Sequence, residues 1–222
     1  MTNVVAFLIS FAASVVAIVV VLYTERQRRP LLRFRIVPPI IIPAGDDVRP
    51  QCTWFGIEVS NAPCSRWLAW VYTREPAMSC RAYVSFFCTC GDRLLPGEMP
   101  ARWSGLVEPR IETIQVGGGQ IAYLRDAIPT VDLHANNAEG IHPVVVFPSP
   151  FQTFGWTNES YLYGWRHPQW AISHDTFVIR IRATTADREF VGCFRIDLTG
   201  GYANMRIDQL DSEFDSRYSN VA

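Results

Sequence analysis

The longest apolar run of the chain lies at its beginning. From Val4 to Tyr23, twenty residues include only Ser10 and Ser14 as polar members. At about 1.5 Å per helical residue this run spans roughly 30 Å, the thickness of the hydrocarbon core of a bilayer. No basic residue precedes the run and no small-residue cleavage site follows it, so the pattern differs from that of a cleavable signal peptide. We therefore predict a transmembrane helix that stays in the mature protein, within an anchor at residues 1–29.

After the anchor the pattern of hydrophobic and polar positions changes to a period of two. The clearest case is Thr176–Thr184, where Phe177, Ile179 and Ile181 alternate with residues that include Arg180 and Arg182. Comparable runs recur about every 10 residues with Pro and Gly between them, which predicts an all-β fold, an antiparallel β-sandwich of the immunoglobulin-like type. The predicted strands are 52–63, 79–90, 111–116, 120–126, 130–134, 142–147, 159–165, 176–184 and 189–198.

Proline and charge divide the rest of the chain. Residues 30–50 begin as an edge strand and then meet Pro38, Pro39, Pro43 and Pro50, which predicts a first strand followed by a stiff connector. The β-sandwich domain is expected at 51–200. An acidic and polar tail is expected at 201–222, ordered only if something binds it.

Several stretches carry a resemblance to a known group of proteins. The segments "FGIEVSNAP", "SCRAYVSFF", "PARWSG" and "WTNESYLYGWRHPQW" resemble those of uncharacterised prokaryotic single-pass membrane-anchored proteins with an immunoglobulin-like β-sandwich. The resemblance implies the fold and the anchoring. It implies no activity.

The charges beside the predicted helix indicate its orientation. Arg26, Arg28 and Arg29 follow the apolar run closely, where arginine also contacts lipid headgroups at the membrane interface. Positive charge marks the cytoplasmic side, so we favour an outside N-terminus and a cytoplasmic β domain. The six cysteines keep the exported orientation open, because an exported domain could use them in up to three disulfides.

Composition excludes several classes of enzyme. All twenty basic residues are arginine, so the chain lacks the lysine that a P-loop, a protein kinase or Schiff-base chemistry requires. The formal net charge of −1 offers no basic surface for nucleic acid.

Two groups of residues are weighed as chemical sites. Cys88 and Cys90 lie two apart on a predicted strand and could ligate one metal ion, but the pattern matches no structural zinc motif. Buried and reduced cysteines are the favoured interpretation. The second group consists of Asp132, His134, Glu139 and His142. A metal-dependent hydrolase would need these side chains to meet in one pocket. Their spacing matches no ligand pattern, so we predict no catalytic residue, no metal and no cofactor.

Two features suggest contact surfaces. Ala6, Ser10 and Ser14 recur every four residues on one helix face, a pattern that allows another transmembrane helix to approach closely. The aromatic segment after Pro150 could contact a partner or a sugar, or could fill the core with its Trp nitrogens bonded to backbone carbonyls. Its candidate contact residues are Trp156, Tyr161, Tyr163, Trp165, Arg166 and Trp170.

These observations favour a non-enzymatic accessory, scaffold or protein-binding module in a membrane complex. Its partners would be the lipid bilayer and other membrane protein subunits, contacted through the helix and the β domain. The alternative is an exported surface domain that binds carbohydrate or another envelope component. The metal-dependent hydrolase is the third hypothesis.

Overall fold

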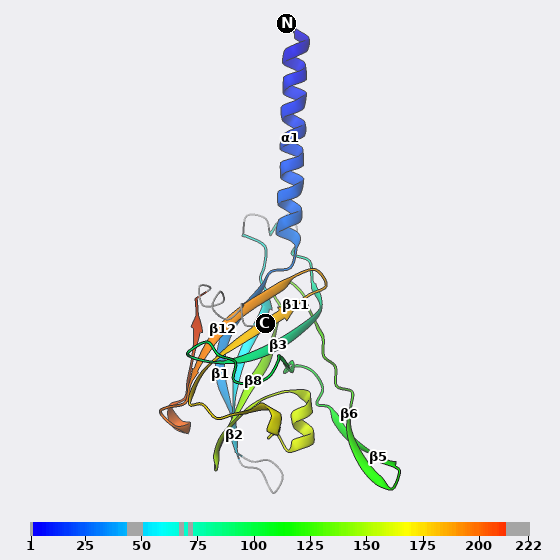
Figure 1. Cartoon of the computed structure of the whole chain (residues 1–222). Helices are drawn as coiled ribbons and strands as arrows, with labels where there is room; N and C mark the ends of the chain where they lie inside the picture. The colour runs from blue at the N-terminus through cyan, green and yellow to red at the C-terminus, as the bar shows by residue number, and fades with distance from the viewer. Residues whose placement is uncertain (1, 44–50, 67–68, 71–72, 212–222) are drawn as a thin grey trace.

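A computed structural model of the chain describes residues 2–43, 51–66, 69–70 and 73–211. One long helix, α1 (Thr2–Arg28), projects from a domain built of strands (Figure 1). Residues Val4–Arg28 are apolar and long enough to cross a membrane, and none of the most apolar part of this helix is buried inside the protein. The predicted N-terminal apolar helix is therefore present.

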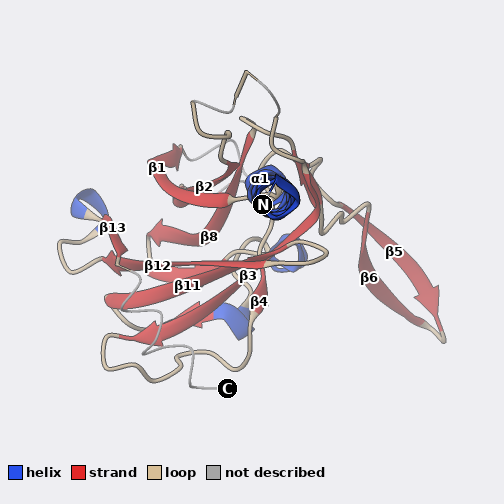
Figure 2. Ribbon diagram, turned by 90° about the horizontal axis from the view of Figure 1, so that it is seen from above, coloured by secondary structure: helices blue, strands red, loops and turns tan. Residues whose placement is uncertain are grey.

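The strands form two antiparallel sheets with a shared core. The first sheet has the order β1 (Leu32–Ile42), β2 (Cys52–Asn61), β8 (Ala138–Pro148), β9 (Phe151–Gly155) and β10 (Ala171–Ile172). The second has the order β13 (Arg206–Leu210), β12 (Glu189–Asp197), β11 (Thr176–Thr184), β3 (Ala77–Cys88) and β4 (Met99–Pro100), and β7 (Val131–Leu133) also pairs with β3. Figure 2 shows the two sheets as separate layers below the end of α1.

The core lies where the two sheets face each other. Phe55 and Ile57 of the first sheet pack in one cluster with Phe177, Ile179 and Ile181 of the second, and all five side chains are fully buried. Strand β11 thus buries the face that its alternation predicts. The prediction of an antiparallel all-β fold after one N-terminal apolar helix is confirmed.

Two boundaries differ from the sequence-based expectation. Strand β1 continues through Pro38 and Pro39 to Ile42, with a register shift between Val37 and Ile40. It tolerates these prolines because it is an edge strand, where a missing N–H need not break a ladder. Strand β13 lies inside the expected tail and pairs with β12. Residues 44–50 of the expected connector and 212–222 of the tail lie outside the described residues.

The predicted strand at 159–165 is wrong. Residues Asn158–Tyr163 form a short 3₁₀ helix, η1, and a second one, η2, covers Pro168–Trp170. Thr157 caps η1, because its hydroxyl accepts a hydrogen bond from the Glu159 N–H at 2.9 Å and its own N–H donates to the Ser160 hydroxyl at 3.1 Å. Such local bonds offer the backbone an alternative to a sheet ladder. A third short helix, η3 (Tyr202–Asn204), precedes β13.

The end of α1 is attached to the domain by buried polar contacts. The guanidinium of Arg74, only 7% exposed, donates to the carbonyl of Arg29 at 2.6 Å. Arg28 contacts the Glu75 carboxylate at 3.5 Å, and the Glu75 N–H donates to the Arg28 carbonyl at 2.7 Å. The helix is therefore joined to the sheets by more than the chain connection itself.

Candidate functional site: the protruding hairpin

A third sheet of two strands extends away from the domain. Strands β5 (Arg110–Val116) and β6 (Gly119–Arg125) pair only with each other among the described residues, so each has one open edge. Gly117 and Gly118 connect them with φ of 56° and 87°, a left-handed backbone that glycine adopts without strain. The hairpin lies at the end of the domain remote from α1 and projects sideways from both layers (Figures 1 and 2).

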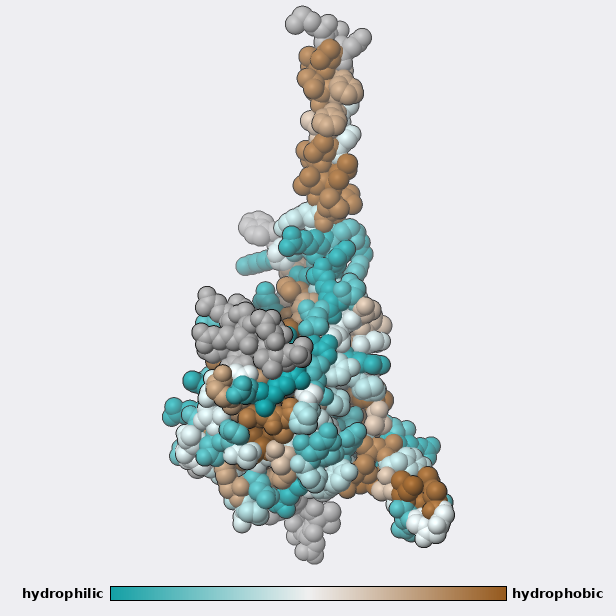
Figure 3. Space-filling model, in the orientation of Figure 1, coloured by the Kyte–Doolittle hydropathy of each residue, from teal (hydrophilic) through white to brown (hydrophobic). Residues whose placement is uncertain are grey.

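One face of this hairpin is apolar toward its tip, whereas Glu112 and Tyr123 occupy the same face nearer the domain. In an antiparallel pair, residues directly opposite each other share a face. Ile114 lies opposite Ile121, with Val116 on the same face beyond them, and these side chains are 47%, 52% and 50% exposed. The neighbouring pair, Thr113 and Ala122, lies on the other face. Figure 3 shows the apolar residues of the hairpin as a brown patch at its outer end.

In the part of the hairpin nearer the domain, polar contacts link the two strands to each other. Glu112 accepts a hydrogen bond from the Tyr123 hydroxyl at 2.6 Å and another from the Arg125 guanidinium at 2.8 Å. These two bonds hold the pKa of Glu112 below its usual value. The carboxylate therefore stays charged near neutral pH and links β5 to β6 just inside the apolar pair.

A small groove lies at the base of the hairpin. Its lining includes Leu124 of β6, Arg81 and Tyr83 of β3, and Asn158 and Glu159 of η1. Its volume is about 240 Å³, below the roughly 300–1,000 Å³ typical of sites for small ligands. The groove brings the aromatic segment next to the hairpin but does not by itself define a ligand.

The aromatic segment is mostly structural. Trp156 and Trp170 are buried, Tyr161 and Trp165 are partly buried, and Tyr163 is 50% exposed. Of the six candidate contact residues, two are buried, three are partly exposed, and Tyr163 is the one that is largely exposed. Arg166 lies over the Phe147 ring at 4.4 Å, so it too covers the domain.

The aromatic residues form a second core on the outer face of the first sheet. Trp156 lies 5.1 Å from Trp54 and 5.4 Å from both Tyr161 and Trp165, as measured between ring centroids. Cys52, Val145, Phe147 and Phe154 belong to the same cluster. The expected bonds from Trp nitrogens to carbonyls are not general: within the described residues, Nε1 of Trp54 and of Trp170 is buried without a hydrogen-bond partner.

The helix candidates remain available for contact. Ala6, Ser10 and Ser14 are exposed along α1, and the Ser14 hydroxyl donates to the Ser10 carbonyl of its own helix at 2.9 Å. Arg26, Arg28 and Arg29 are exposed at its C-terminal end. Arg28 also contacts Glu75, so only part of this arginine cluster is committed to the domain.

The four candidate residues for a hydrolase do not converge. In the described part of the chain, none of Asp132, His134, Glu139 and His142 belongs to a group of three potential ligands within 4.8 Å of one another. The Asp132 carboxylate accepts the Ser79 N–H at 2.7 Å, a structural contact. His142 is buried against Trp54, and burial, together with the charge of Arg102, lowers its pKa to about 4. Its imidazole is therefore neutral at physiological pH.

The cysteines differ in part from the expectation of reduced, buried thiols. Cys52, Cys64, Cys80 and Cys193 are buried, and burial raises the pKa of Cys52 and of Cys80 to about 11. Cys88 and Cys90 instead form a disulfide. The expectation is wrong for this pair, because the turn after β3 brings the two sulfurs together where a continued strand would hold them apart.

The sequence predicts both strands of the hairpin but not that the hairpin protrudes from the domain. A usable signal was the triple glycine at 117–119 between two runs of equal length without proline. Both runs carry apolar residues on each face, so the pattern does not say which face is buried. Comparison with known proteins adds nothing to this geometry: the chain matches no protein family, no curated protein and no solved structure.

Proposed function

We propose that this chain is a single-pass membrane protein whose β domain binds a protein partner through the β5–β6 hairpin, without enzymatic activity. The observation that carries the proposal is the cluster of Ile114, Ile121 and Val116, exposed on a hairpin that, in the described part of the chain, pairs with neither sheet. Two-stranded hairpins are marginally stable alone in water, and clustered exposed apolar side chains mark interaction sites.

The proposed partner is a protein segment in extended conformation. Each hairpin strand offers an open edge of backbone N–H and C=O groups, and a strand added there would place alternate apolar side chains beside Ile114 and Ile121. The hairpin points away from α1, so the bilayer that holds the helix is not its partner (Figure 1). Other membrane subunits would contact the exposed face of Ala6, Ser10 and Ser14.

Membrane anchoring is supported by the region where α1 meets the domain. Trp70 is 84% exposed and lies in sequence between Cys64 and Arg74. Cys64 contacts the carbonyl of Gln27, and Arg74 contacts that of Arg29. An exposed Trp beside exposed arginines at the end of an apolar helix is typical of a membrane interface. We therefore propose that the interface lies at the end of α1, with the domain in the cytoplasm.

The hairpin is tested by charges placed on one face at a time. We expect Ile114→Asp with Ile121→Asp to weaken association with the native partner by about tenfold or more, because charge would be desolvated at the contact. The matched control is Thr113→Asp with Ala122→Asp, which adds the same charges to the opposite face. Both pairs lie outside the core, and each variant places two aspartates directly opposite each other, so any cost of this repulsion to the hairpin is common to the two variants.

The measurement is cross-linking of the full chain in native membranes, followed by purification in mild detergent. Loss of the cross-linked species in the Ile114/Ile121 variant alone supports the hairpin face, and a differently tagged copy of the chain shows whether that partner is a second copy. Equal retention, or equal loss, in the two variants would overturn the proposal.

Orientation is tested with a cysteine on the hairpin. In a background of Cys88→Ser and Cys90→Ser, the remaining native cysteines are buried, so Gln115→Cys provides the exposed thiol. We expect a membrane-impermeant maleimide to label it only after cell lysis, because arginines beside a transmembrane helix favour the cytoplasmic side for the domain that follows. The background chain without Gln115→Cys should stay unlabelled. Labelling in intact cells would instead support the exported, envelope-binding alternative.

A further inference from the structure

The Cys88–Cys90 disulfide joins the buried last residue of β3 to the exposed turn that follows it, on a different segment from the hairpin. Cys88 is 8% exposed, whereas Cys90 and the neighbouring Asp92 are exposed. The bond closes a loop with a sequence separation of only 2. The entropic stabilisation by a disulfide grows with the length of the loop that it closes, so this one adds little to the stability of the fold.

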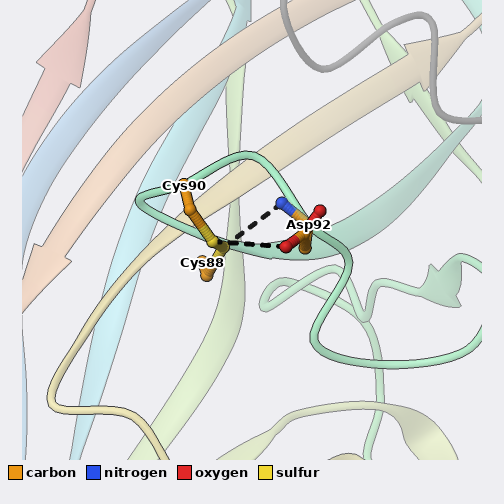
Figure 4. The surroundings of a disulfide bond; sticks show 3 residues. All are labelled: Cys88, Cys90 and Asp92. Carbon is orange, nitrogen blue, oxygen red and sulfur yellow. Dashed lines mark hydrogen bonds between the residues drawn. A yellow bond between two sulfur atoms is a disulfide. The ribbon is translucent and has the colours of Figure 1, made fainter.

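The surroundings of the two sulfurs differ in a way that suits exchange. The backbone N–H of Asp92 donates to Cys88 Sγ at 3.2 Å, which would stabilise negative charge on that sulfur. On the other side, Cys90 Sγ lies 3.5 Å from Asp92 Oδ2 (Figure 4). A disulfide sulfur has no hydrogen to donate, so the second contact becomes a hydrogen bond only when Cys90 carries a thiol.

We propose that Cys88 and Cys90 form a reversible thiol–disulfide exchange site for small-molecule thiols of the glutathione type, with Cys90 as the sulfur attacked. An external thiolate forms a bond to the exposed Cys90 sulfur. The Cys88–Cys90 bond breaks, and its electron pair leaves on Cys88 as a thiolate. The Asp92 N–H keeps its proton and stabilises this thiolate by donating a hydrogen bond to it.

A second external thiolate completes the reduction. It attacks the small-molecule sulfur of the mixed disulfide, which releases Cys90 as a thiolate that takes a proton and donates it in a hydrogen bond to Asp92 Oδ2. The Cys88 thiolate takes up a second proton, because each small-molecule thiol releases one when it ionises. Overall, the protein disulfide gains two electrons and two protons and becomes a dithiol, while two small-molecule thiols become one disulfide. The reverse reaction uses that small-molecule disulfide as the oxidant.

The buried thiols provide the contrast. Burial raises the pKa of Cys52 and Cys80 to about 11, so both remain protonated and unreactive near neutral pH. The ligand atoms of Cys88, Cys90 and Asp92 also lie within 4.8 Å of one another, a spacing that could suit a cation once the disulfide is reduced. The exchange experiment therefore contains a chelator.

The test uses the full chain in mild detergent, equilibrated in glutathione buffers of varied thiol-to-disulfide ratio. Remaining thiols are then blocked with a maleimide and the peptides are identified by mass spectrometry. We expect the Cys88–Cys90 pair to change from disulfide to dithiol within this range. Cys52 and Cys80 should carry no glutathione at any ratio. A pair that keeps one redox state across the whole range would overturn the proposal.

Two matched variants identify the attacked sulfur. With glutathione disulfide, Cys88→Ser should accumulate glutathione on Cys90, and Cys90→Ser should accumulate at least about tenfold less on the buried Cys88. The two variants have the same composition and each lacks the disulfide, so each controls for the fold of the other. Equal modification of the two sulfurs would contradict the assignment of Cys90.

Discussion

Replacement of Trp156 by alanine should lower the free energy of unfolding by about 3–5 kcal/mol. The side chain is 1% exposed and contacts the rings of Trp54, Tyr161 and Trp165, so its removal leaves a cavity between several large groups. Domains are typically stable by only about 5–15 kcal/mol, so this single change would remove a large part of the total. Urea unfolding of the full chain in mild detergent, followed by circular dichroism, measures it.

The control for this change is Tyr163→Ala. Tyr163 belongs to the same aromatic segment but is 50% exposed and stacks only on the edge of the domain, 4.2 Å from the His167 ring. We expect it to cost about 1 kcal/mol or less. Equal free energies of unfolding for the two variants would show that the buried aromatic cluster around Trp156 does not stabilise the fold as its burial indicates.

The Trp156 result also decides how binding experiments on this segment are interpreted. An aromatic stacking surface for sugar would lose affinity when its Trp is removed while the fold stays intact. Because Trp156 is interior, a loss of binding in Trp156→Ala would reflect unfolding of the second core. Tyr163→Ala is the informative variant for any ligand that contacts the aromatic segment, since it changes the exposed surface at low structural cost.

The sequence predicts those features that depend on regular burial. Phe177, Ile179 and Ile181 alternate cleanly because one face of β11 packs against the other sheet, and the apolar run of α1 is uniform over its length. Local side-chain bonds are harder to foresee. Residues 159–165 alternate like a strand, yet the Thr157 and Ser160 hydroxyls cap η1 instead.

The candidate site was predictable only as separate pieces. Both hairpin strands could be recognised from their composition, but nothing in one sequence shows that Ile114 and Ile121 meet no other sheet. The aromatic segment was recognised as notable, yet its large side chains cover Phe147 just before it and Trp54, which is distant in the sequence. Which of several apolar groups ends up exposed is a property of the tertiary packing and not of the local pattern.

Replacement of Asn61 by alanine should lower the free energy of unfolding by about 3 kcal/mol or more, because it removes the partners of three polar groups at about 1–3 kcal/mol for each one that stays buried. Asn61 is fully buried at the end of β2. Its Oδ1 accepts the Leu31 N–H at 3.1 Å, and its Nδ2 donates to the carbonyls of Glu75 and Leu133 at 2.8 and 3.0 Å. Alanine can replace none of these bonds.

Asn137→Ala is the matched control, because the Asn137 side chain is exposed while its backbone carbonyl accepts the Asn61 N–H at 3.2 Å. We expect it to change the unfolding free energy by about 0.5 kcal/mol or less. Asn61→Asp keeps an acceptor for Leu31 but buries a charge and loses both donated bonds, so it should be at least as destabilising as Asn61→Ala. Equal stability of the Asn61 and Asn137 alanine variants would contradict the role of this amide.

The same substitution should loosen the attachment of α1, because two partners of Asn61 belong to the segments that hold the helix. Leu31 follows the last turn of α1, and Glu75 contacts Arg28 through both its carboxylate and its N–H. Hydrogen exchange of the Arg29, Leu31 and Glu75 amides should therefore become faster in Asn61→Ala than in Asn137→Ala, even under conditions where the sheets remain folded. Unchanged exchange at these amides would mean that the contacts of Arg74 and Glu75 hold the helix on the domain without help from Asn61.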